Sequence, residues 1–382
     1  MKILLDPEIF QLQRYGGVSR YYTELFTVLK LNKNIKVIIP FYSTNNIYFN
    51  QSNLVTLRQK AYNLYLRFLI KFKIRYKENS SKRNLLFFNK SLAKKNYDLF
   101  VPTYYNPSFL QKKDKIPFVL TVYDMIHELF PEYFNEDTHN VVVNKKIMIE
   151  RASQIIAVSE NTKKDILKIY PHIESRKIHV VYHASSLKIN EVLSVSIPEE
   201  YILFIGNRVG YKNFQFLVDA TSQMLRLNSK LHIVCAGGGS FDNSEIEHIN
   251  KLGLANQIIQ IDFREEELYH FYVNAKCFVF PSLYEGFGIP VLEAMRCGCP
   301  VILSNSSAFP EVAGDAGIYF EQKDSIDLKN KIEKIIDNPE IRNDYIQRGF
   351  QQAKKFSWEK AAKECLQVYE LACSKKLKAL RR

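Results

Sequence analysis

Several motifs that would assign this chain to a familiar class are missing from its sequence. It has no Asp-x-Asp pattern, no Gly-x-Gly-x-x-Gly and no Gly-x-x-x-x-Gly-Lys-Ser/Thr. The first absence removes a pair of carboxylates that could hold a divalent cation. The other two remove the usual glycine-rich cradles for dinucleotides and nucleoside triphosphates. We therefore expect chemistry that needs no metal ion and no cofactor.

Long apolar runs are missing as well. No stretch reaches the ~18 apolar residues of a membrane-spanning helix. The amino end, MKILLDPEIF, places Asp6 and Pro7 where a signal peptide needs its apolar centre. No two of the six cysteines form a Cys-x-x-Cys pair, so the sequence does not indicate a zinc site. We expect all six cysteines to be reduced. Together these absences predict a cytoplasmic protein.

What the sequence does have is length and positive charge. A chain of 382 residues exceeds what one hydrophobic core usually accommodates, so we expect two domains of roughly 180 residues each. The 53 lysines and arginines against 40 aspartates and glutamates give a formal net charge of +13. Between Arg58 and Lys95 the basic residues are accompanied by a single acid, Glu78. The positive charge is therefore concentrated in one segment.

This basic segment, residues 58–95, also carries interleaved leucine, isoleucine, tyrosine and phenylalanine, as in YNLYLRFLIKFKIRY. Such a pattern favours an amphipathic helix lying on an anionic membrane. It is also typical of a solvated charged face or of a nucleic-acid-binding patch. We take peripheral contact with the inner face of the cell membrane as the leading interpretation and expect no nucleic-acid partner.

Short apolar strands alternate with helical patterns along the whole chain, which is typical of parallel sheets covered on both faces by helices. In the first half, strands are expected at 2–6, 36–40, 97–102, 117–124, 154–159 and 178–183. In the second half, they are expected at 201–206, 231–237, 257–262, 277–281, 300–304 and 317–320. The predicted fold class is α/β, with two Rossmann-like halves.

A break in this alternation marks the expected domain boundary. Residues 185–200 lose the periodic pattern and gather serines and a proline, as linkers do. We predict an N-terminal domain at 1–184, the linker at 185–200, and a C-terminal domain at 201–357. A last helix and a basic tail then occupy 358–382.

The segment PSLYEGFGIPVLEAMRCGCP, residues 281–300, is the most informative part of the chain. Glu285 and Glu293 stand eight residues apart, and Gly286, Gly288 and Pro290 lie at the junction of a strand and a helix. Glycines there let backbone N–H groups approach a ligand, and a helix N-terminus attracts a phosphate. Glu293 can then accept hydrogen bonds from a ribose, and Glu285 from a second polyol. The pattern predicts a sugar-nucleotide site.

The same segment resembles the motif of two glutamates separated by seven residues in retaining GT-B glycosyltransferases of family 4. The resemblance implies two Rossmann-like domains facing a central cleft, with the terminal helix returning to the N-terminal domain. It implies that Glu285 contacts the donor sugar and Glu293 the ribose. The diphosphate would meet the intervening backbone, at Gly286, Phe287, Gly288 and Ile289.

Two further loops extend this resemblance to the diphosphate. In GNRVGYKN, residues 206–213, Arg208 offers a planar fork and Lys212 a point charge, both suited to phosphate. They match the family's phosphate-binding Arg and Lys, whose charge would stabilise the departing nucleoside diphosphate without a metal. Gly16 and Gly17 open a helix in the first half, and the family's loop at this place faces the diphosphate across the cleft. The role of the neighbouring Arg20 stays open.

His127 is the fourth catalytic candidate, with Glu285, Arg208 and Lys212. It follows the strand expected at 117–124, where the family commonly has Thr-x-His-Asp. This sequence has Tyr123 in the histidine position and the histidine later, so either His127 or Tyr123 fills the role. Glu311, in a Pro-Glu-Val-Ala-Gly segment, is expected to be structural and bonded to nearby backbone.

The patterns GNRVGYKNF and VYDMIHELFPE resemble the mannosyltransferase branch of the family. This implies a retaining, metal-independent transfer of a hexose, with GDP-mannose as the donor. The acceptor would be a glycan or a lipid-linked glycan in surface polysaccharide assembly, such as O-antigen of lipopolysaccharide or capsule. A GT-B nucleotide-sugar epimerase and a basic nucleic-acid-binding protein are the alternatives. The second leaves the glutamate motif unexplained.

Overall fold

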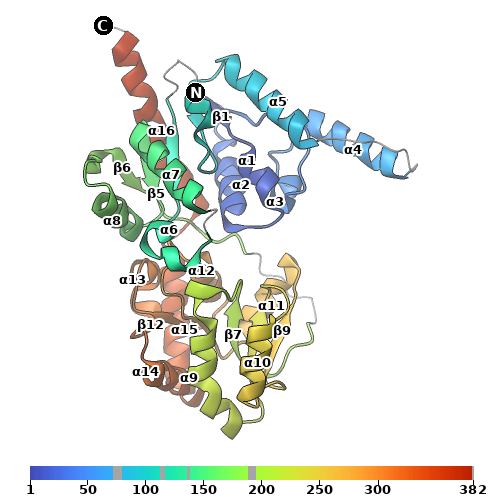
Figure 1. Cartoon of the computed structure of the whole chain (residues 1–382), viewed down its shortest axis with the longest axis vertical. Coiled ribbons are helices and arrows are strands. Elements are labelled where there is room, and N and C mark those ends of the chain that lie inside the picture. Colours follow the sequence, from blue (N-terminus) through green and yellow to red (C-terminus); the bar gives the residue numbers. More distant parts are fainter. Residues whose placement is uncertain (72–79, 112–116, 136–137, 188–194, 381–382) are drawn as a thin grey trace.

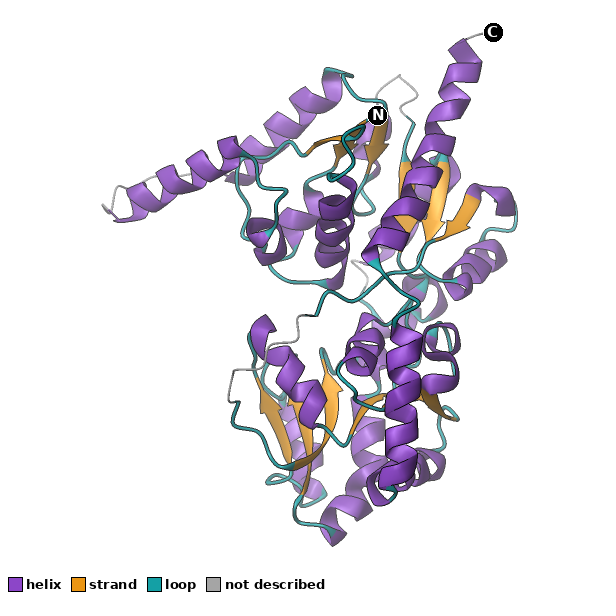
Figure 2. Ribbon diagram, turned by 180° about the vertical axis from the view of Figure 1, so that it is seen from behind, coloured by secondary structure: helices purple, strands orange, loops and turns teal. Residues whose placement is uncertain are grey.

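The computed structural model describes residues 1–71, 80–111, 117–135, 138–187 and 195–380. Within these ranges the chain forms two lobes, each built on parallel strands with helices packed against them (Figure 1, and from behind in Figure 2). Residues 188–194 of the predicted linker, and Lys73, Arg75 and Lys77 of the basic segment, lie outside the described residues.

The N-terminal lobe contains two three-stranded parallel sheets. The first has the order β2-β1-β3, with β1 at Lys2–Leu5, β2 at Lys36–Ile38 and β3 at Leu99–Val101. The second has the order β4-β5-β6, with β4 at Val119–Val122, β5 at Gln154–Ala157 and β6 at Ile178–Val180. A parallel bridge between Phe100 and Phe118 joins β3 to the start of β4. The lobe therefore has one continuous strand order, β2-β1-β3-β4-β5-β6.

Two hydrophobic cores cover the faces of this sheet. One includes Tyr22 and Phe26 of α2, and the other includes Met148 and Ile149 of α7. The helices of the lobe are α1 (Glu8–Leu12), α2 (Gly17–Leu29), α3 (Ile47–Gln51), α4 (Leu57–Lys71), α5 (Ser80–Ala93), α6 (Ile126–Leu129), α7 (His139–Arg151) and α8 (Glu160–Ile169).

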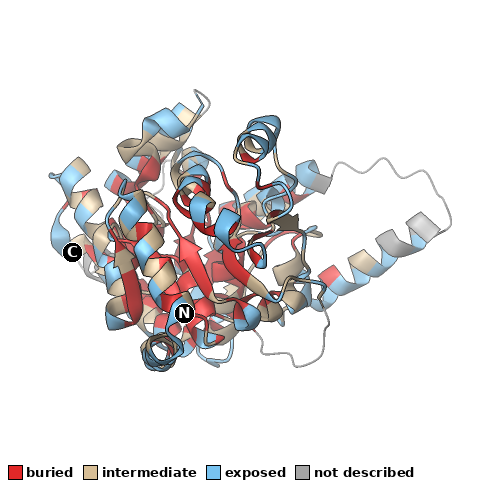
Figure 3. Cartoon of the chain, turned by 90° about the horizontal axis from the view of Figure 1, so that it is seen from below, coloured by how far each residue is buried: buried red, intermediate tan, exposed pale blue. Residues whose placement is uncertain are grey.

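Helices α4 and α5, which we call the helical arm, lie at one side of the N-terminal lobe, and α4 extends away from it (Figure 1). Leu57 and Leu64 of α4 and Leu86 of α5 are exposed. Seen from below, the strands are buried at the centre whereas the projecting arm is largely exposed (Figure 3). Among the helices in the described ranges, none combines the length and the apolar character needed to cross a bilayer.

The C-terminal lobe contains one six-stranded parallel sheet in the order β12-β11-β10-β7-β8-β9. Its strands are β7 (Glu200–Ile205), β8 (Leu231–Ala236), β9 (Ile258–Ile261), β10 (Cys277–Phe280), β11 (Val301–Ser304) and β12 (Gly317–Phe320). Its helices are α9 (Phe214–Leu227), α10 (Asn243–Lys251), α11 (Leu268–Asn274), α12 (Ile289–Arg296), α13 (Phe309–Ala313), α14 (Ser325–Asp337) and α15 (Pro339–Ala353). The twelve strands found in the described part of the chain all overlap their predicted ranges.

The last helix, α16 (Trp358–Leu380), packs on the N-terminal lobe. Its buried residues Trp358, Cys365 and Tyr369 share a core with α2, and the Tyr21 hydroxyl lies 3.8 Å from the Cys365 Sγ. The chain thus passes from the N-terminal lobe to the C-terminal lobe and back.

The strand orders create one topological switch point in each lobe. In the N-terminal lobe the chain adds β2 on one side of β1 and then β3 on the other. In the C-terminal lobe β8 and β9 lie on one side of β7, and β10 begins the other side. Ligands of open α/β sheets bind outside the carboxyl ends of the strands at such points. The fold therefore offers two crevices, one between β1 and β3 and one between β7 and β10.

Candidate active site

The predicted glutamate motif follows β10, at the switch point of the C-terminal lobe. The chain leaves the sheet after Phe280 and enters α12 at Ile289, with Pro290 in the first turn. Gly288, the N-cap residue, has φ of +99°, which residues with a Cβ rarely adopt. The backbone at this helix opening therefore requires a glycine, and its N–H groups are available at the edge where a ligand would lie.

Glu285 and Lys212 lie together at this switch point. Lys212 follows β7 and Glu285 follows β10, and the Lys212 Nζ is 2.5 Å from the Glu285 Oε1. Both side chains are mostly buried. Burial opposes the charged form of Lys212, but the Glu285 charge outweighs it and the pKa of Lys212 is raised. The structure thus brings two predicted donor contacts into one ion pair, with the lysine charged.

Glu293 is buried, only 3% exposed, and both its oxygens have partners. Its Oε1 is 2.8 Å from Nη1 of Arg20, and its Oε2 accepts a hydrogen bond of 3.1 Å from the Tyr272 hydroxyl. Glu265 lies 3.5 Å from Nη2 of the same arginine. Arg20, whose role the sequence leaves open, therefore reaches from α2 across to the C-terminal lobe.

The other predicted phosphate ligand, Arg208, is engaged by protein groups. Its Nε is 2.8 Å from the Glu245 Oε1, and its terminal nitrogens donate to the carbonyls of Gly237, Gly239 and Ser240. The side chain is nearly fully buried. Arg208 follows β7, as the sequence predicts, but its guanidinium group is hydrogen-bonded to the turn after β8 in this structure.

Gly16 and Gly17 open α2, with Gly16 at the N-cap. The Oε1 of Gln13 accepts a hydrogen bond from the Ser19 N–H, which satisfies one donor of the first turn. Gly17 is exposed, and a Cβ there would meet no atom within 4 Å. Because Arg20 in the same turn contacts Glu293, this end of α2 faces the C-terminal lobe.

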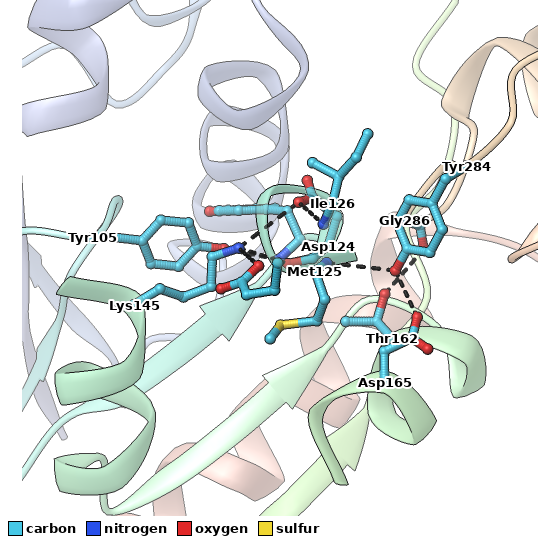
Figure 4. A network of polar contacts seen from close by, with 11 residues as sticks. Tyr105, Asp124, Met125, Ile126, Lys145, Thr162, Asp165, Tyr284 and Gly286 are labelled. Carbon is cyan, nitrogen blue, oxygen red and sulfur yellow. Dashed lines mark hydrogen bonds and ion pairs between the residues drawn. The ribbon is translucent and has the colours of Figure 1, made fainter. Parts of the chain in front are cut away.

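The loop before α12 rests directly on the N-terminal lobe (Figure 4). A Cβ on Gly286 would lie 1.7 Å from the backbone oxygen of Tyr123, so only glycine fits there. The Tyr284 hydroxyl donates to Asp165 at 2.7 Å and accepts from the Met125 N–H at 3.4 Å. These contacts fix the position of Glu285 relative to the N-terminal lobe.

A buried lysine supports the other side of this contact. Lys145 of α7 is fully buried, and its ammonium group is 2.9 Å from the Glu128 carboxylate and donates to the Asp124 carbonyl at 3.1 Å (Figure 4). Sequence reasoning missed Lys145 because it appears among ordinary basic residues of a helix. Its position in the apolar run VVVNKKIMIE is the signal that could have found it.

Tyr123 and His127, the two candidates for the histidine role, have their side chains in different surroundings. Tyr123 packs edge-on against Tyr21, and its hydroxyl donates to the Thr103 carbonyl at 3.4 Å. His127 packs against Phe134 with ring centroids 4.3 Å apart and the ring planes tilted by 36°, and its buried Nδ1 has no hydrogen-bond partner within the part of the chain that the structure describes. Burial and then the Lys145 charge lower the pKa of His127, so the ring is neutral at pH 7.

Three further predicted residues have mainly structural surroundings. Phe287 packs in the hydrophobic core, 5.1 Å from His183 between ring centroids, so only its backbone can meet a ligand. Ile289 is half-buried at the start of α12. Glu311 accepts hydrogen bonds from the backbone N–H groups of Glu160 and Asn161. Its backbone partners are thus not nearby in sequence but on α8 of the other lobe.

Metal ligands do not gather in the described part of the chain, which contains no group of three or more His, Cys, Asp or Glu side chains placed to hold an ion. The six cysteines form no disulfide among the described residues, and all but Cys373 are buried.

Comparison with known sequences matches two family models to adjacent parts of the chain. Glycosyltransferase Family 4 matches residues 15–187, and Glycosyl transferases group 1 matches residues 188–352. The O-antigen chain mannosyltransferase B of Escherichia coli is 28% identical over 293 residues, which cover 72% of this chain and 75% of that protein. The E. coli serotype-specific mannosyltransferase WbdA is 29% identical over 270 residues, covering 65% of this chain and 33% of that protein.

Among solved structures, Anabaena HepE in complex with UDP and glucose has a TM-score of 0.69 at 17% sequence identity. The match covers 96% of this chain and 99% of that one. This likeness confirms the predicted GT-B fold of two Rossmann-like lobes. The matches give no support to an epimerase or to a nucleic-acid-binding protein.

Proposed function

Since the chain belongs to the glycosyltransferases of family 4 and group 1, we propose that it transfers a hexose from a nucleotide sugar with retention of configuration. The observation that carries this proposal is the pairing of Glu285 with Lys212 at the switch point between β7 and β10. A carboxylate suits the hydroxyls of a sugar, and an ammonium group beside it suits the attached phosphate.

The donor would lie along this edge of the C-terminal lobe. Its diphosphate would meet Lys212 and the N-terminus of α12, where the helix dipole favours negative charge. Gly16 and Gly17, at the opening of α2, would approach it from the N-terminal lobe. Glu293 would hold the ribose while Arg20 keeps the carboxylate oriented.

The transfer itself needs the bond from the sugar C1 to the phosphate oxygen to break as an acceptor oxygen bonds to C1 on the same face. The acceptor proton passes to the departing phosphate oxygen. Lys212 and the two helix N-termini stabilise the charge that develops on the diphosphate, in place of a metal ion. Arg208 can add to this only by exchanging its contact with Glu245 for the phosphate. His127, neutral and with a ring nitrogen unpaired within the described ranges, would donate to or accept from the sugar.

For the donor we propose GDP-mannose, and for the acceptor a glycan or lipid-linked glycan of a surface polysaccharide. Support comes from the O-antigen mannosyltransferases among the relatives, at 28% and 29% identity. We also propose that the helical arm places the enzyme on the inner face of the membrane, because exposed leucines there lie among lysines and arginines.

Three measurements test these proposals. Thermal shift with GDP, UDP, ADP and CMP should show the largest stabilisation by GDP, followed by turnover of GDP-mannose that EDTA leaves unchanged. Equal shifts with all four nucleotides would reject a specific donor site, and loss of turnover in EDTA would reject metal independence. Flotation with anionic liposomes at low salt should carry the protein upward, and failure to float would reject the membrane contact.

A further inference from the structure

The switch point of the N-terminal lobe holds a groove that the proposed donor site does not use. The groove has a volume of about 630 Å³ and lies between α1, α5 and the chain that follows β3. Pockets that bind small molecules span ~300–1,000 Å³, so a sugar residue fits. The predicted donor ligands Glu285, Lys212 and Glu293 are not among its lining residues.

One side of the groove is polar. Asp6 and Glu8 follow β1, and Asn106 follows β3. The Glu8 Oε1 accepts a hydrogen bond of 3.0 Å from the Asn106 amide, and the Asp6 Oδ1 accepts one of 3.1 Å from the Glu8 N–H. The Glu8 Oε2 is buried and accepts no hydrogen bond from an N–H or hydroxyl of the described residues. Within the protein, the proton that this oxygen can accept is the one on the neighbouring Asp6 carboxyl group, whose side chain interacts with that of Glu8.

The two carboxyl groups differ from an ordinary pair of acids. Burial and then the Glu8 charge raise the pKa of Asp6 to about 8, and burial raises the pKa of Glu8 as well. At neutral pH the pair therefore retains a proton that the two groups can share. A pair that both donates and accepts hydrogen bonds is suited to neutral hydroxyl groups, and it is poorly suited to phosphate, which would meet negative charge.

Apolar side chains line the groove beside these polar groups. Leu85 and Phe88 of α5 line it next to Ser81 and Asn89 of the same helix, and Leu85 is 56% exposed. A pyranose ring has one face of C–H groups and a rim of hydroxyls. A lining that mixes apolar side chains with carboxylates and amides matches that combination, whereas a lipid chain would leave the polar groups unsatisfied.

The polar residues of the groove lie at the same edge of the sheet as residues that contact the C-terminal lobe, such as Met125, whose N–H donates to the Tyr284 hydroxyl. Asp124 contacts Lys145 in the network that supports Tyr284 and its neighbour Glu285 (Figure 4). Asp6, Asn106 and Asp124 follow the carboxyl ends of β1, β3 and β4, so they share one edge of the sheet.

We propose that this groove binds a sugar residue of the acceptor, with its hydroxyls on Asp6, Glu8 and Asn106 and its apolar face on Leu85 and Phe88. The proposal rests on the proposed glycosyl transfer, because the sugar is identified as part of the acceptor by that reaction. Glu8 and Leu85 act here as binding residues, not as groups that touch the reacting atoms.

The test uses the full chain and two variants in the groove. Leu85→Trp fills the groove from an exposed position, and Glu8→Gln removes a charge while keeping an oxygen for Asn106. Leu31→Trp is the matched control, because Leu31 is 72% exposed in the same lobe and does not line the groove. Saturation-transfer NMR with a panel of methyl hexopyranosides measures sugar binding, and GDP-induced thermal shift measures the nucleotide site separately.

We expect the wild type and Leu31→Trp to bind at least one methyl hexopyranoside. Binding should be lost in Leu85→Trp and weakened about 10-fold in Glu8→Gln, as for loss of a hydrogen bond to a charged group. The GDP shift and hydrolysis of the donor in the absence of acceptor should be unchanged in all variants. Sugar binding that survives in Leu85→Trp, or no sugar binding by the wild type, overturns the groove assignment. Absence of nucleotide binding in the wild type overturns the proposed function instead, whatever the sugar result.

Discussion

Arg20 of α2 and Glu293 of α12 form a buried ion pair across the two lobes, with Nη1 and Oε1 2.8 Å apart. Burial opposes the charged form of Arg20, but the charges of Glu293 and Glu265 outweigh it and raise the pKa of the arginine. A buried pair of this kind loses hydration on both partners, so each partner depends on the other. The pair therefore couples the contact between the lobes to the carboxylate proposed to hold the ribose.

Removal of Arg20 should leave Glu293 buried without its cation. We expect Arg20→Ala to lower the free energy of unfolding by about 3 kcal/mol or more, and to weaken nucleoside diphosphate binding. Urea denaturation and isothermal titration with GDP measure the two effects. Arg14→Ala is the control, because Arg14 is an exposed arginine of the preceding loop. An unchanged urea midpoint in Arg20→Ala would show that the pair contributes nothing to stability.

Glu285 should be needed for transfer and not for folding. In Glu285→Gln the side chain keeps its size, and Lys212 loses a partner but stays partly accessible to water. We expect the transfer rate to fall about 100-fold or more, with the melting temperature changed by only a few degrees. Glu340→Gln, an exposed substitution in the same lobe, should keep full activity. Normal turnover in Glu285→Gln would remove this residue from the proposed site.

Gly286 should tolerate no side chain, because a Cβ would lie 1.7 Å from a backbone atom, the Tyr123 oxygen. A backbone atom cannot move aside as a flexible side chain can. Gly286→Ala is therefore expected to push the lobes apart, lowering the melting temperature and increasing the radius of gyration in solution scattering. Gly17→Ala, where the added Cβ meets no atom within 4 Å, should retain the wild-type melting temperature. If both variants melt and scatter alike, the lobes do not make this contact in solution.

Asp6 should make stability depend on pH. Its pKa is raised from 3.8 to about 8, first by burial and then by Glu8. Between these values the folded protein holds a proton that the unfolded chain has released, so the free energy of unfolding should fall as the pH rises towards 8. Asp6→Asn should show a weaker decrease in urea denaturation between pH 5 and pH 8. Asp337→Asn, an exposed aspartate, should follow the wild type. A wild-type slope in Asp6→Asn would assign the pH dependence to other groups.

The position of each strand that the structure describes could be predicted from the sequence, because an apolar run and its flanking breaks are local signals. The helix opening at Gly288 and Pro290 was predictable for the same reason, since a backbone turn depends on the residues that form it. Partners were not predictable. Arg20 and Glu293 are 273 positions apart, and Lys212 and Glu285 are 73 apart. The sequence predicted that Arg208 would be free to bind phosphate. In the structure Arg208 forms an ion pair with Glu245 of α10, and no local sequence pattern predicts how α10 packs against Arg208.

The sequence alone determined the two α/β halves, the glutamate motif and the absence of an Asp-x-Asp pattern, because each depends on residues that are close together along the chain. Only the tertiary structure decided which charges pair across the lobes, and that Asp6, Glu8 and Asn106 line one groove. The order of the strands in a sheet sets the distances between these side chains. That order depends on the free energy of packing the whole chain rather than on any one segment.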